Sequence, residues 1–525
     1  MKKIILFFAI SFITAWVYGQ GEMDAFRLSG GDLSGTARGV AMGGAFGALG
    51  GDITGVSQNP AGIGIYRSAE LVTTLGFASV NTEANTLGTI GKDSKFNFSL
   101  DNFAWLGRSA NNNSFNVGIV YNRLKNFGRN YQAEGNELTS SLTDYIANFT
   151  TRENINPKDF SSYLGNGWRY NGYPWISVLG YAGGLIEPNG FDANRRYKYV
   201  SPLAESETVD RTYSVSERGY IDTYDFIMGG NASKIYWGLT LSITSMRYKI
   251  NSRHDEEFGY RGGFNLDNYL ETKGTGFQTS AGIIYQPLDE LRMGVAYHSP
   301  TWYNLVDDYY AQANCNYVTN EGRIRLQAET PDEYTDYRFR TPDRWVMSVA
   351  GILGEKALLS LDYEYSNYSR MKLTDEYYYE YYYEDQNSYI AEDFKGASTL
   401  KVGMEYKVTP QIALRAGYAW MQSPLEKSFK AGNVEVLPVG TTTAYTLDGD
   451  TQFFSCGAGY RFTSNFYIDA AFLYKKQTNQ LYTYSPIYNE GLEVISFPSE
   501  LKNDTYKVLL TLGYKFKLFG KKMKL

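Results

Sequence analysis

The sequence predicts an all-β fold, a transmembrane antiparallel β-barrel of about fourteen strands with an N-terminal plug, or hatch, in its lumen. Three observations support this prediction. The chain begins with a short export signal, its later apolar residues alternate with polar ones at period two, and tight turns alternate with long connecting segments. We expect a signal peptide at 1–19, the plug at 20–68, and the barrel with long extracellular loops at 69–525.

The first residues carry the export signal. Lys2 and Lys3 precede an apolar run from Ile4 to Val17, and small Gly19 before Gln20 suits signal peptidase. No later stretch reaches the roughly 18 apolar residues that a membrane-spanning helix needs, so a mature chain that spans a membrane must do so as a closed barrel. The expected location is the outer membrane, with the barrel-assembly machinery as a partner during biogenesis.

Composition agrees with this interpretation. The chain contains 47 Tyr, 29 Phe and 53 Gly, yet its mean hydropathy is only -0.37, because lipid-facing and lumen-facing residues cancel in a barrel. The formal charge is -6, and it falls by two units when Lys2 and Lys3 are removed with the signal. Nucleic acid is therefore not an expected partner.

The last strand shows the alternation most clearly. Even positions from Tyr506 to Phe516 are aromatic or aliphatic, whereas Lys507, Thr511 and Lys515 stand at odd positions. We expect the even positions to face lipid and the odd ones to face inward.

The same pattern recurs in pairs of strands joined by tight turns. The expected strands are 71–77, 96–100, 114–122, 224–228, 237–243, 277–285, 291–297, 345–353, 358–365, 400–406, 412–420, 454–462, 466–474 and 506–516. Turns at 111–113, 231–234, 286–289, 354–356, 408–411 and 463–465 all fall on the periplasmic side if the last strand ends there. The segments 122–218, 249–272, 300–342, 367–396, 422–450 and 477–503 are then expected as long extracellular loops.

The stretch before the first strand has a different character. It is rich in glycine, including Gly43 and Gly44 beside Phe46, and it closes with Asn59-Pro60-Ala61. A flexible periplasmic tail is one interpretation, but its aliphatic and aromatic residues favour packing, and the barrel lumen is the natural place. Pro60 would fix a turn that anchors this plug or gate.

Two motifs in this stretch carry a family resemblance. Met42-Gly43-Gly44-Ala45-Phe46 and Asn59-Pro60-Ala61-Gly62 stand at a spacing similar to that of the FadL/TodX (OmpP1) family of outer-membrane hydrophobic-compound transporters, in particular the Bacteroidetes branch often labelled hemin receptor. The resemblance implies passive transport of a hydrophobic small molecule, fatty acid-like or aromatic, with outer-membrane lipid as a further partner.

The resemblance also implies lateral exit through a defect in the third strand, expected at 114–122. Gly118 lies within that strand, and a strand glycine can mark a bulge. The alternative is that Gly118 only makes room for the plug.

Further residues have two interpretations each. The run of Tyr377, Tyr378, Tyr379, Tyr381, Tyr382 and Tyr383 would line a ligand mouth, or it is an ordinary exposed hairpin tip. Inward charges such as Lys401, Glu405 and Arg415 would steer a carboxylate, or they hold the plug.

Catalysis is not expected, because the chain has only two histidines, His254 and His298, and neither belongs to a catalytic motif. We expect no catalytic residue, no metal site and no cofactor. Two alternatives to a transporter stay open. One is a heme or other ligand receptor at the outer surface, with His298 or a tyrosine as ligand, and the other is a structural or adhesive barrel.

Overall fold

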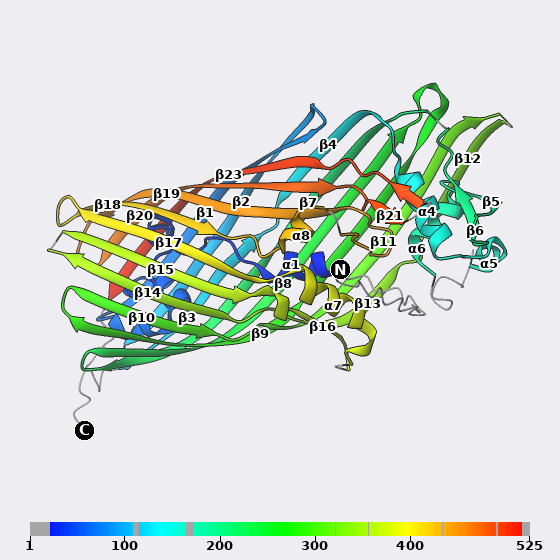
Figure 1. Cartoon of the computed structure of the whole chain (residues 1–525). Coiled ribbons are helices and arrows are strands. Elements are labelled where there is room, and N and C mark those ends of the chain that lie inside the picture. Colours follow the sequence, from blue (N-terminus) through cyan, green and yellow to red (C-terminus); the bar gives the residue numbers. More distant parts are fainter. Residues whose placement is uncertain are drawn as a thin grey trace, which may run out of the picture.

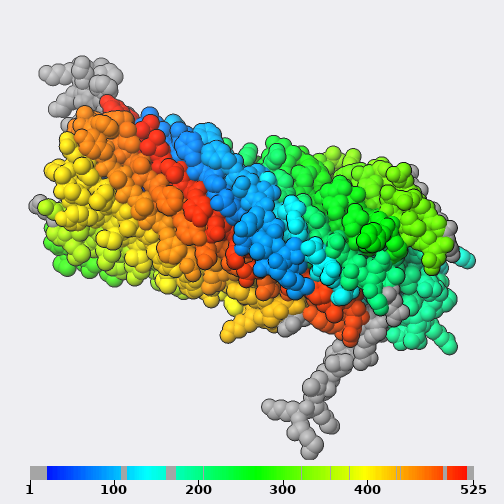
Figure 2. Space-filling view, turned by 90° about the horizontal axis from the view of Figure 1, so that it is seen from above, coloured from blue at the N-terminus to red at the C-terminus, as the bar shows by residue number. Residues whose placement is uncertain are grey.

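The computed structural model describes residues 21–516 except 109–114, 164–172, 205, 321, 355, 378, 433, 438 and 490–491. Its main body is a closed antiparallel barrel of 14 strands, in which β1 (Ala69–Thr86) pairs with β23 (Ser499–Phe516). Figure 2 shows these two segments, blue and red, side by side along the wall. The predicted fold class is confirmed, whereas the signal peptide and the turn at 111–113 lie outside the described residues.

Most barrel strands are continuous, and three are interrupted. The other continuous strands are β2 (Thr89–Arg108), β7 (Val209–Ala232), β8 (Ile235–Glu257), β9 (Gly262–Leu288), β15 (Ala357–Asn367), β17 (Gly396–Lys407), β18 (Ile412–Met421), β19 (Tyr445–Arg461) and β20 (Phe466–Tyr482). The interrupted strands consist of β3 (Phe115–Asn126) with β4 (Arg129–Leu138), β10 (Leu291–His298) with β11 (Trp302–Thr319), and β12 (Gly322–Glu329) with β13 (Glu333–Arg340) and β14 (Arg344–Leu353).

The expected register of the last strand is confirmed. Leu510, Leu512 and Tyr514 are 38%, 38% and 50% exposed on the outer wall, whereas Thr511 is 1% exposed on the inner face. The barrel thus turns its apolar positions outward, as lipid requires.

Two segments expected as loops are mostly strand, so that part of the prediction was wrong. Residues 249–272 continue β8 and β9 around the short turn η3 (Gly259–Arg261), and 300–342 form β11, β12 and β13. In these extensions the alternation is reversed, because inward positions such as Ala311, Ala313 and Tyr317 are apolar and buried. The extended hairpins carry the wall toward the end of the molecule that bears α4 and β12 in Figure 1.

The segment 139–208 forms a small helical unit at that end. It contains α4 (Leu142–Arg152), α5 (Pro157–Tyr163), α6 (Trp175–Ala182), β5 (Glu187–Phe191) and β6 (Tyr197–Val200). α4 begins with a capping box, in which Ser141 accepts from Thr143 N and Asp144 accepts from Ser141 N. Tyr145 and Trp175 then pack in one core with Ala311 and Tyr317 of β11.

Other short elements lie in two places. These are η4 (Tyr368–Arg370), β16 (Lys372–Asp375), η5 (Tyr381–Tyr383), α7 (Glu384–Asp393), α8 (Lys427–Lys430), β21 (Ile487–Asn489) and β22 (Leu492–Val494). β21 and β22 pack with the helical unit, whereas residues of α7 and α8 share a core with α1 (Glu22–Ser29) nearer the middle of the molecule (Figure 1).

The N-terminal segment, residues 21–68, lies inside the barrel. It contains α1 (Glu22–Ser29), α2 (Ala37–Ala41), α3 (Ile53–Gln58) and η1 (Pro60–Ile65). Its backbone contacts inner wall positions on opposite sides of the barrel, since Ala37 N donates to Thr511 Oγ1 at 2.7 Å and Gly47 N donates to Asp362 Oδ2 at 2.8 Å. No helix among the described residues has the length and apolarity needed to cross a membrane.

Candidate functional site

Asn59 anchors the N-terminal segment to the wall. Its Nδ2 donates to Gly47 O at 2.8 Å and to Ile283 O of β9 at 3.3 Å. Its Oδ1 accepts from Ala61 N at 3.0 Å, which sets the turn that Pro60 begins. One amide thus joins two parts of the segment to the barrel, and Asn59, Pro60 and Ala61 are all buried.

Two glycines of the wall, Gly282 and Gly238, face this turn. A Cβ on Gly282 would overlap Asn59 Oδ1, and a Cβ on Gly238, its partner across the β8–β9 ladder, would overlap Pro60 O. Gly403 and Gly417 form a second facing pair against the backbone at Met42 and Gly43. The segment therefore fits the wall through contacts that any larger side chain would block.

The plug motif itself is buried. Gly43 and Gly44 have φ of 65° and 72°, a region that favours glycine, and Phe46 is fully buried against Met42, Ala48 and the wall.

Charged side chains clamp the periplasmic half of the segment. Arg38 Nε lies 2.9 Å from Glu405 Oε2, and Arg415 bonds both to that oxygen at 2.6 Å and to Asp469 at 2.5 Å. Lys401 pairs with Glu364. This geometry agrees with the interpretation in which the inward charges hold the N-terminal segment.

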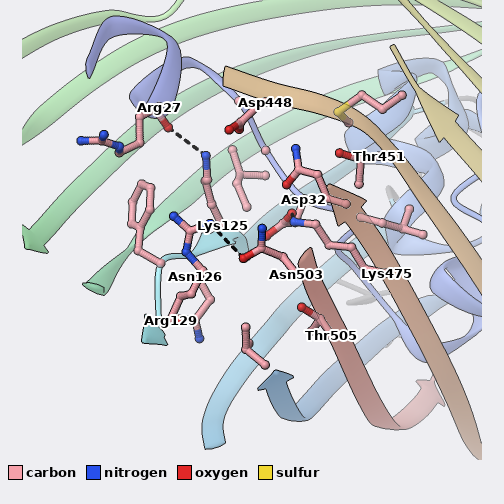
Figure 3. A pocket seen from close by; sticks show the side chains of 18 of the residues that line it. Arg27, Asp32, Lys125, Asn126, Arg129, Asp448, Thr451, Lys475, Asn503 and Thr505 are labelled. Carbon is pink, nitrogen blue, oxygen red and sulfur yellow. Dashed lines mark hydrogen bonds and ion pairs between the residues drawn. The ribbon is translucent and has the colours of Figure 1, made fainter. Parts of the chain in front are cut away.

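A cavity of about 220 Å³ lies beside α1. It is lined by residues 23–34 of the N-terminal segment, residues 123–129 at the β3–β4 junction, and inner positions of β1, β2, β19, β20 and β23. Glu217 of β7, Tyr368 of η4 and residues 421–424 complete the lining. Its apolar lining includes Met23, Phe26, Leu124, Phe127 and Phe453. Its polar side is shown in Figure 3. The cavity therefore offers both an apolar surface and a charged one.

Most charges in this cavity are paired with one another. Arg129 bonds to Glu217 at 2.7 Å, and Lys475 pairs with Asp32. Burial disfavours the charged form of Asp32, but Lys475 and Lys125 outweigh this effect and hold the pKa of that carboxyl below its usual value. Such pairs leave little net charge.

Lys125 differs from its neighbours. Its Nζ donates to Arg27 O at 2.8 Å and lies 5.0 Å from the centre of the Phe127 ring, and Figure 3 shows it pointing into the cavity from the strand. Within the described residues Lys125 makes no salt bridge. It is thus a cation with donor capacity left for a ligand.

The wall next to the cavity has a gap in its backbone ladder. β2 pairs with β3 from Arg108 to Asn102, and in the described chain no ladder joins the remainder of β2 to β4, which pairs only with β7. Two side-chain bonds cross this gap, from Asn97 Nδ2 to Gly128 O at 2.7 Å and from Lys95 Nζ to Asn130 Oδ1 at 3.1 Å. On the lipid side, Phe96 and Phe98 are 68% and 58% exposed. Asn97 and Gly128 also line the cavity, so the cavity reaches the wall at this gap.

Gly118 lies away from the gap. It pairs regularly with Leu106 of β2 and Ile227 of β7. A Cβ on it would overlap Leu106 Cδ2, whereas Ile63 Cδ1 of the N-terminal segment would lie at 3.7 Å, an ordinary contact distance. Gly118 therefore makes room for Leu106 of the neighbouring strand, and a role beside the plug stays a prediction. The interruption of the third strand stands at residues 127–128 instead.

The tyrosine run lies on the outer surface, at the tip between β16 and α7. Tyr377, Tyr379 and Tyr381 are 69%, 62% and 73% exposed, Tyr382 is partly exposed, and Tyr383 is buried. Tyr378 lies outside the described residues. None of the described tyrosines of the run lines the cavity, so the ligand mouth stays a prediction.

Both histidines are buried and bonded. His298 contacts Ser280 Oγ through Nδ1 at 2.8 Å and Gln58 O through Nε2 at 3.0 Å. His254 Nε2 lies 2.8 Å from Glu256 Oε1. Neither imidazole is directed into the cavity, and no group of three metal-binding side chains occurs among the described residues.

Sequence comparison bears on the second half of the chain, which supplies β19, β20 and β23 to the cavity. Residues 256–516 match the sequence profile of the outer membrane protein transport protein family (OMPP1/FadL/TodX). The matched region, just under half of the chain, is similar to that family. The expected family is therefore supported where the match runs, while the finer branch is not decided by it.

Curated relatives agree over a similar span. Outer membrane protein P1 of Haemophilus influenzae is 26% identical over 225 residues, which cover 40% of this chain and 42% of the relative. The 47 kDa outer membrane protein of Pasteurella multocida is 26% identical over 211 residues, which cover 38% and 44%. The matched region thus spans less than half the length of these relatives. Together with the barrel, they place the chain in the outer membrane.

Solved structures share the whole fold. A FadL homologue of Pseudomonas aeruginosa has a TM-score of 0.55 at 14% identity, and the match covers 93% of this chain and 100% of that one. The toluene transporter TodX of P. putida has a TM-score of 0.50 at 12% identity, with the same coverage. At these identities the likeness shows the fold alone.

Sequence reasoning missed Lys125 and Gly128. The signal for Gly128 was present, because the outward apolar alternation of the third strand stops after Tyr121 and a glycine follows at 128. No local pattern distinguishes Lys125. It also missed the wall glycines Gly238 and Gly282, which stand at inward positions of two neighbouring strands.

Proposed function

We propose that this chain is a passive outer-membrane transporter of hydrophobic small molecules. A ligand would occupy the cavity beside α1 and leave sideways through the gap between β2 and β4. The observation that carries this proposal is the coincidence of the two features, because Asn97 and Gly128 belong to both the cavity lining and the gap. A ligand that leaves there enters the apolar phase directly.

The N-terminal segment would act as the plug. It fills the lumen on the periplasmic side of the cavity through the Asn59 turn, the glycine contacts and the Arg38 clamp. A straight water-filled path would then be blocked, and the sideways route would be the open one. Gly43, Gly44, Phe46, Asn59, Pro60 and Ala61 are the residues to which we assign this role.

The ligand class follows from the cavity lining. Met23, Phe26 and Phe453 offer an apolar surface, and Lys125 offers one cation without a carboxylate partner. These features suit an amphiphile with an apolar tail and one anionic end, as in a long-chain carboxylate. An aromatic compound without charge would use the apolar part alone.

Other expectations remain proposals. We propose membership of the Bacteroidetes branch, without heme as ligand, since both histidines are bonded within the protein. We also propose that the chain is not an enzyme, that the barrel-assembly machinery inserts it, and that the exposed tyrosine run contributes to an outer ligand mouth. Deleting residues 377–383 should then lower uptake without loss of folded barrel.

Uptake of a labelled long-chain carboxylate by host cells that lack their own transporter tests the main proposal. Cells with the chain should take the label up faster than cells with the empty vector. A double change, Asn59→Ala with Pro60→Ala, should alter this rate, because it removes the anchor of the plug while the barrel stays heat-modifiable.

The matched control is Asn465→Ala, which removes an amide bond of 2.6 Å to Lys515 O at a periplasmic turn outside the lumen. Its uptake should equal that of the wild type. If the double variant takes up the label at the same rate as the wild type, at equal amounts in the membrane, the segment is not a gate. If cells with the wild-type chain and cells with the empty vector take up the label equally, the chain is not a transporter of this probe.

A further inference from the structure

The outer wall carries an ordered change of chemistry where β7, β8, β9 and β11 lie next to one another. Tyr224, Ile243, Phe277 and Trp302 are neighbours in register across these four strands, and each is between 45% and 48% exposed. Residues directly opposite each other lie on the same face of a sheet. This row is therefore an apolar and aromatic band on the outside, as expected at the edge of the lipid.

Basic residues face outward four positions further along the strands. Arg247 of β8 is directly opposite Lys273 of β9, and one row further out Arg218 of β7 is directly opposite Lys249. Four residues of a tilted strand rise about 10 Å, which is the level of lipid phosphates above the hydrocarbon edge. Figure 2 shows this part of the wall in green.

The protein neutralises these cations only in part. Glu271 bonds to Arg247 at 2.7 Å and to Lys249 at 2.8 Å, and Asp308 is its neighbour in register. Neither Arg218 nor Lys273 makes a salt bridge within the described residues. Like charges directly opposite each other destabilise a sheet. The patch therefore keeps a net positive charge, with four cations against Glu271 and Asp308, and the Arg247 side chain is 51% exposed to an anionic group.

A shallow groove of about 460 Å³ continues beyond the basic patch. Tyr269 and Tyr310 are directly opposite each other in it. Ser216, Asn251 and Arg253 provide donors and acceptors in the same groove. Aromatic faces beside amide, hydroxyl and guanidinium groups are the surface that a sugar ring binds.

We propose that this face binds a phosphorylated glycolipid of the outer leaflet. Its acyl chains would lie on the row of Ile243 and Phe277, a phosphate would bind between Arg247 and Lys273, and the sugars would lie on Tyr269 and Tyr310. The order of apolar, basic and sugar-binding surfaces along one face matches the order of chemical groups in such a lipid. A phospholipid ends at the phosphate and would leave the groove empty. A soluble polysaccharide would not use the apolar row.

The proposal is independent of transport, and binding of two lipids to the purified chain in detergent tests it. The probes are a rough-type lipopolysaccharide and the same lipid after enzymatic removal of its phosphates, measured by native mass spectrometry. The double change Arg247→Gln with Lys273→Gln should weaken binding of the phosphorylated lipid roughly tenfold or more, since each charge at a membrane surface contributes about a factor of five. It should leave the dephosphorylated lipid unaffected.

The matched control is Lys476→Gln with Lys502→Gln, which removes two lysines from outward positions of β20 and β23 just above Tyr474 and Tyr506. Its binding should stay within about twofold of wild type. Tyr269→Ala with Tyr310→Ala should weaken the lipopolysaccharide but not phosphatidylglycerol. Three outcomes would each overturn the proposal. The basic variant and its control could lose binding equally, the wild type could bind the dephosphorylated lipid as well as the phosphorylated one, or it could bind phosphatidylglycerol and lipopolysaccharide equally. Heat-modifiable mobility identifies folded variants.

Discussion

Lys125 is the residue on which ligand selectivity should depend. Lys125→Met keeps the length of the side chain and removes the cation that has no carboxylate partner in the cavity. Because a hydrogen bond to a charged group contributes about 1.5–3 kcal/mol, Kd for a long-chain carboxylate should rise roughly tenfold or more, while Kd for the matching alcohol stays within about twofold. Fluorescent-ligand displacement on the purified chain measures both. Lys125→Arg should restore binding of the carboxylate, and equal losses for acid and alcohol would contradict this role.

Glu22 should make the packing of α1 depend on pH. Burial raises its pKa from 4.5 to about 7, against a hydrogen bond from its backbone, and Asp393 and Asp24 add to the increase. The packed state therefore binds more protons than the released state between pH 4.5 and 7, so packing weakens as pH rises through this range. Hydrogen exchange of α1 amides should be slower at pH 5 than at pH 8 after correction for intrinsic rates. Glu22→Gln should remove this difference, and a difference that persists in the variant would assign it elsewhere.

At the residue scale the sequence predicted the plug better than the cavity. Asn59 and Pro60 stood out because Asn-Pro fixes a turn whatever surrounds it. The partners of Asn59 are backbone atoms of residues 47 and 283, and no local pattern identifies such contacts. Lys125 could not be selected either. It stands out only because the carboxylates in the cavity pair with other cations, and the sequence does not show which cation each carboxylate pairs with.

At the scale of the element, the third strand should control exit. Asn97→Cys with Gly128→Cys, in a background with Cys315→Ala and Cys456→Ala, should form a disulfide across the gap, since the Cβ position of Gly128 lies against the Asn97 side chain. Oxidation should slow uptake of the carboxylate probe, and dithiothreitol should restore it. Asn81→Cys with Ser94→Cys is the control, because these residues pair in the regular β1–β2 ladder. Unchanged uptake with the gap closed would exclude this exit.

The strands also show where period two is and is not sufficient. Inside the lipid the outward positions are apolar, so 237–243 and 506–516 were recognised from their sequences alone. Above the lipid the sign of the alternation reverses, and inward residues such as Ala313 and Tyr317 pack against α4 and α6. A search for outward apolar faces therefore took these strands for loops. Hydrophobic alternation identifies a strand, but the surroundings on each side of the sheet decide which of its two alternating sets of residues is apolar.

At the scale of the whole molecule, alternate residues of each strand face opposite sides of the wall. Outward residues contact lipid, and inward residues contact water or the plug. The natural Cys456 on β19 should report this separation, because it lies on the outer wall between Phe454 and Ala458, whereas its neighbour Ser455 bonds to Ala41 O of the N-terminal segment at 3.2 Å. In a Cys315→Ala variant, a nitroxide on Cys456 in bilayers should be relaxed strongly by oxygen and weakly by a polar nickel complex. A nitroxide at Gln480→Cys, with Cys456→Ala, should show the reverse order, since Gln480 is an exposed residue of a polar groove beyond the lipid band. A shift of one residue would turn position 456 toward Ala41, where neither reagent has access, and weak relaxation by both would contradict the register of the entire wall.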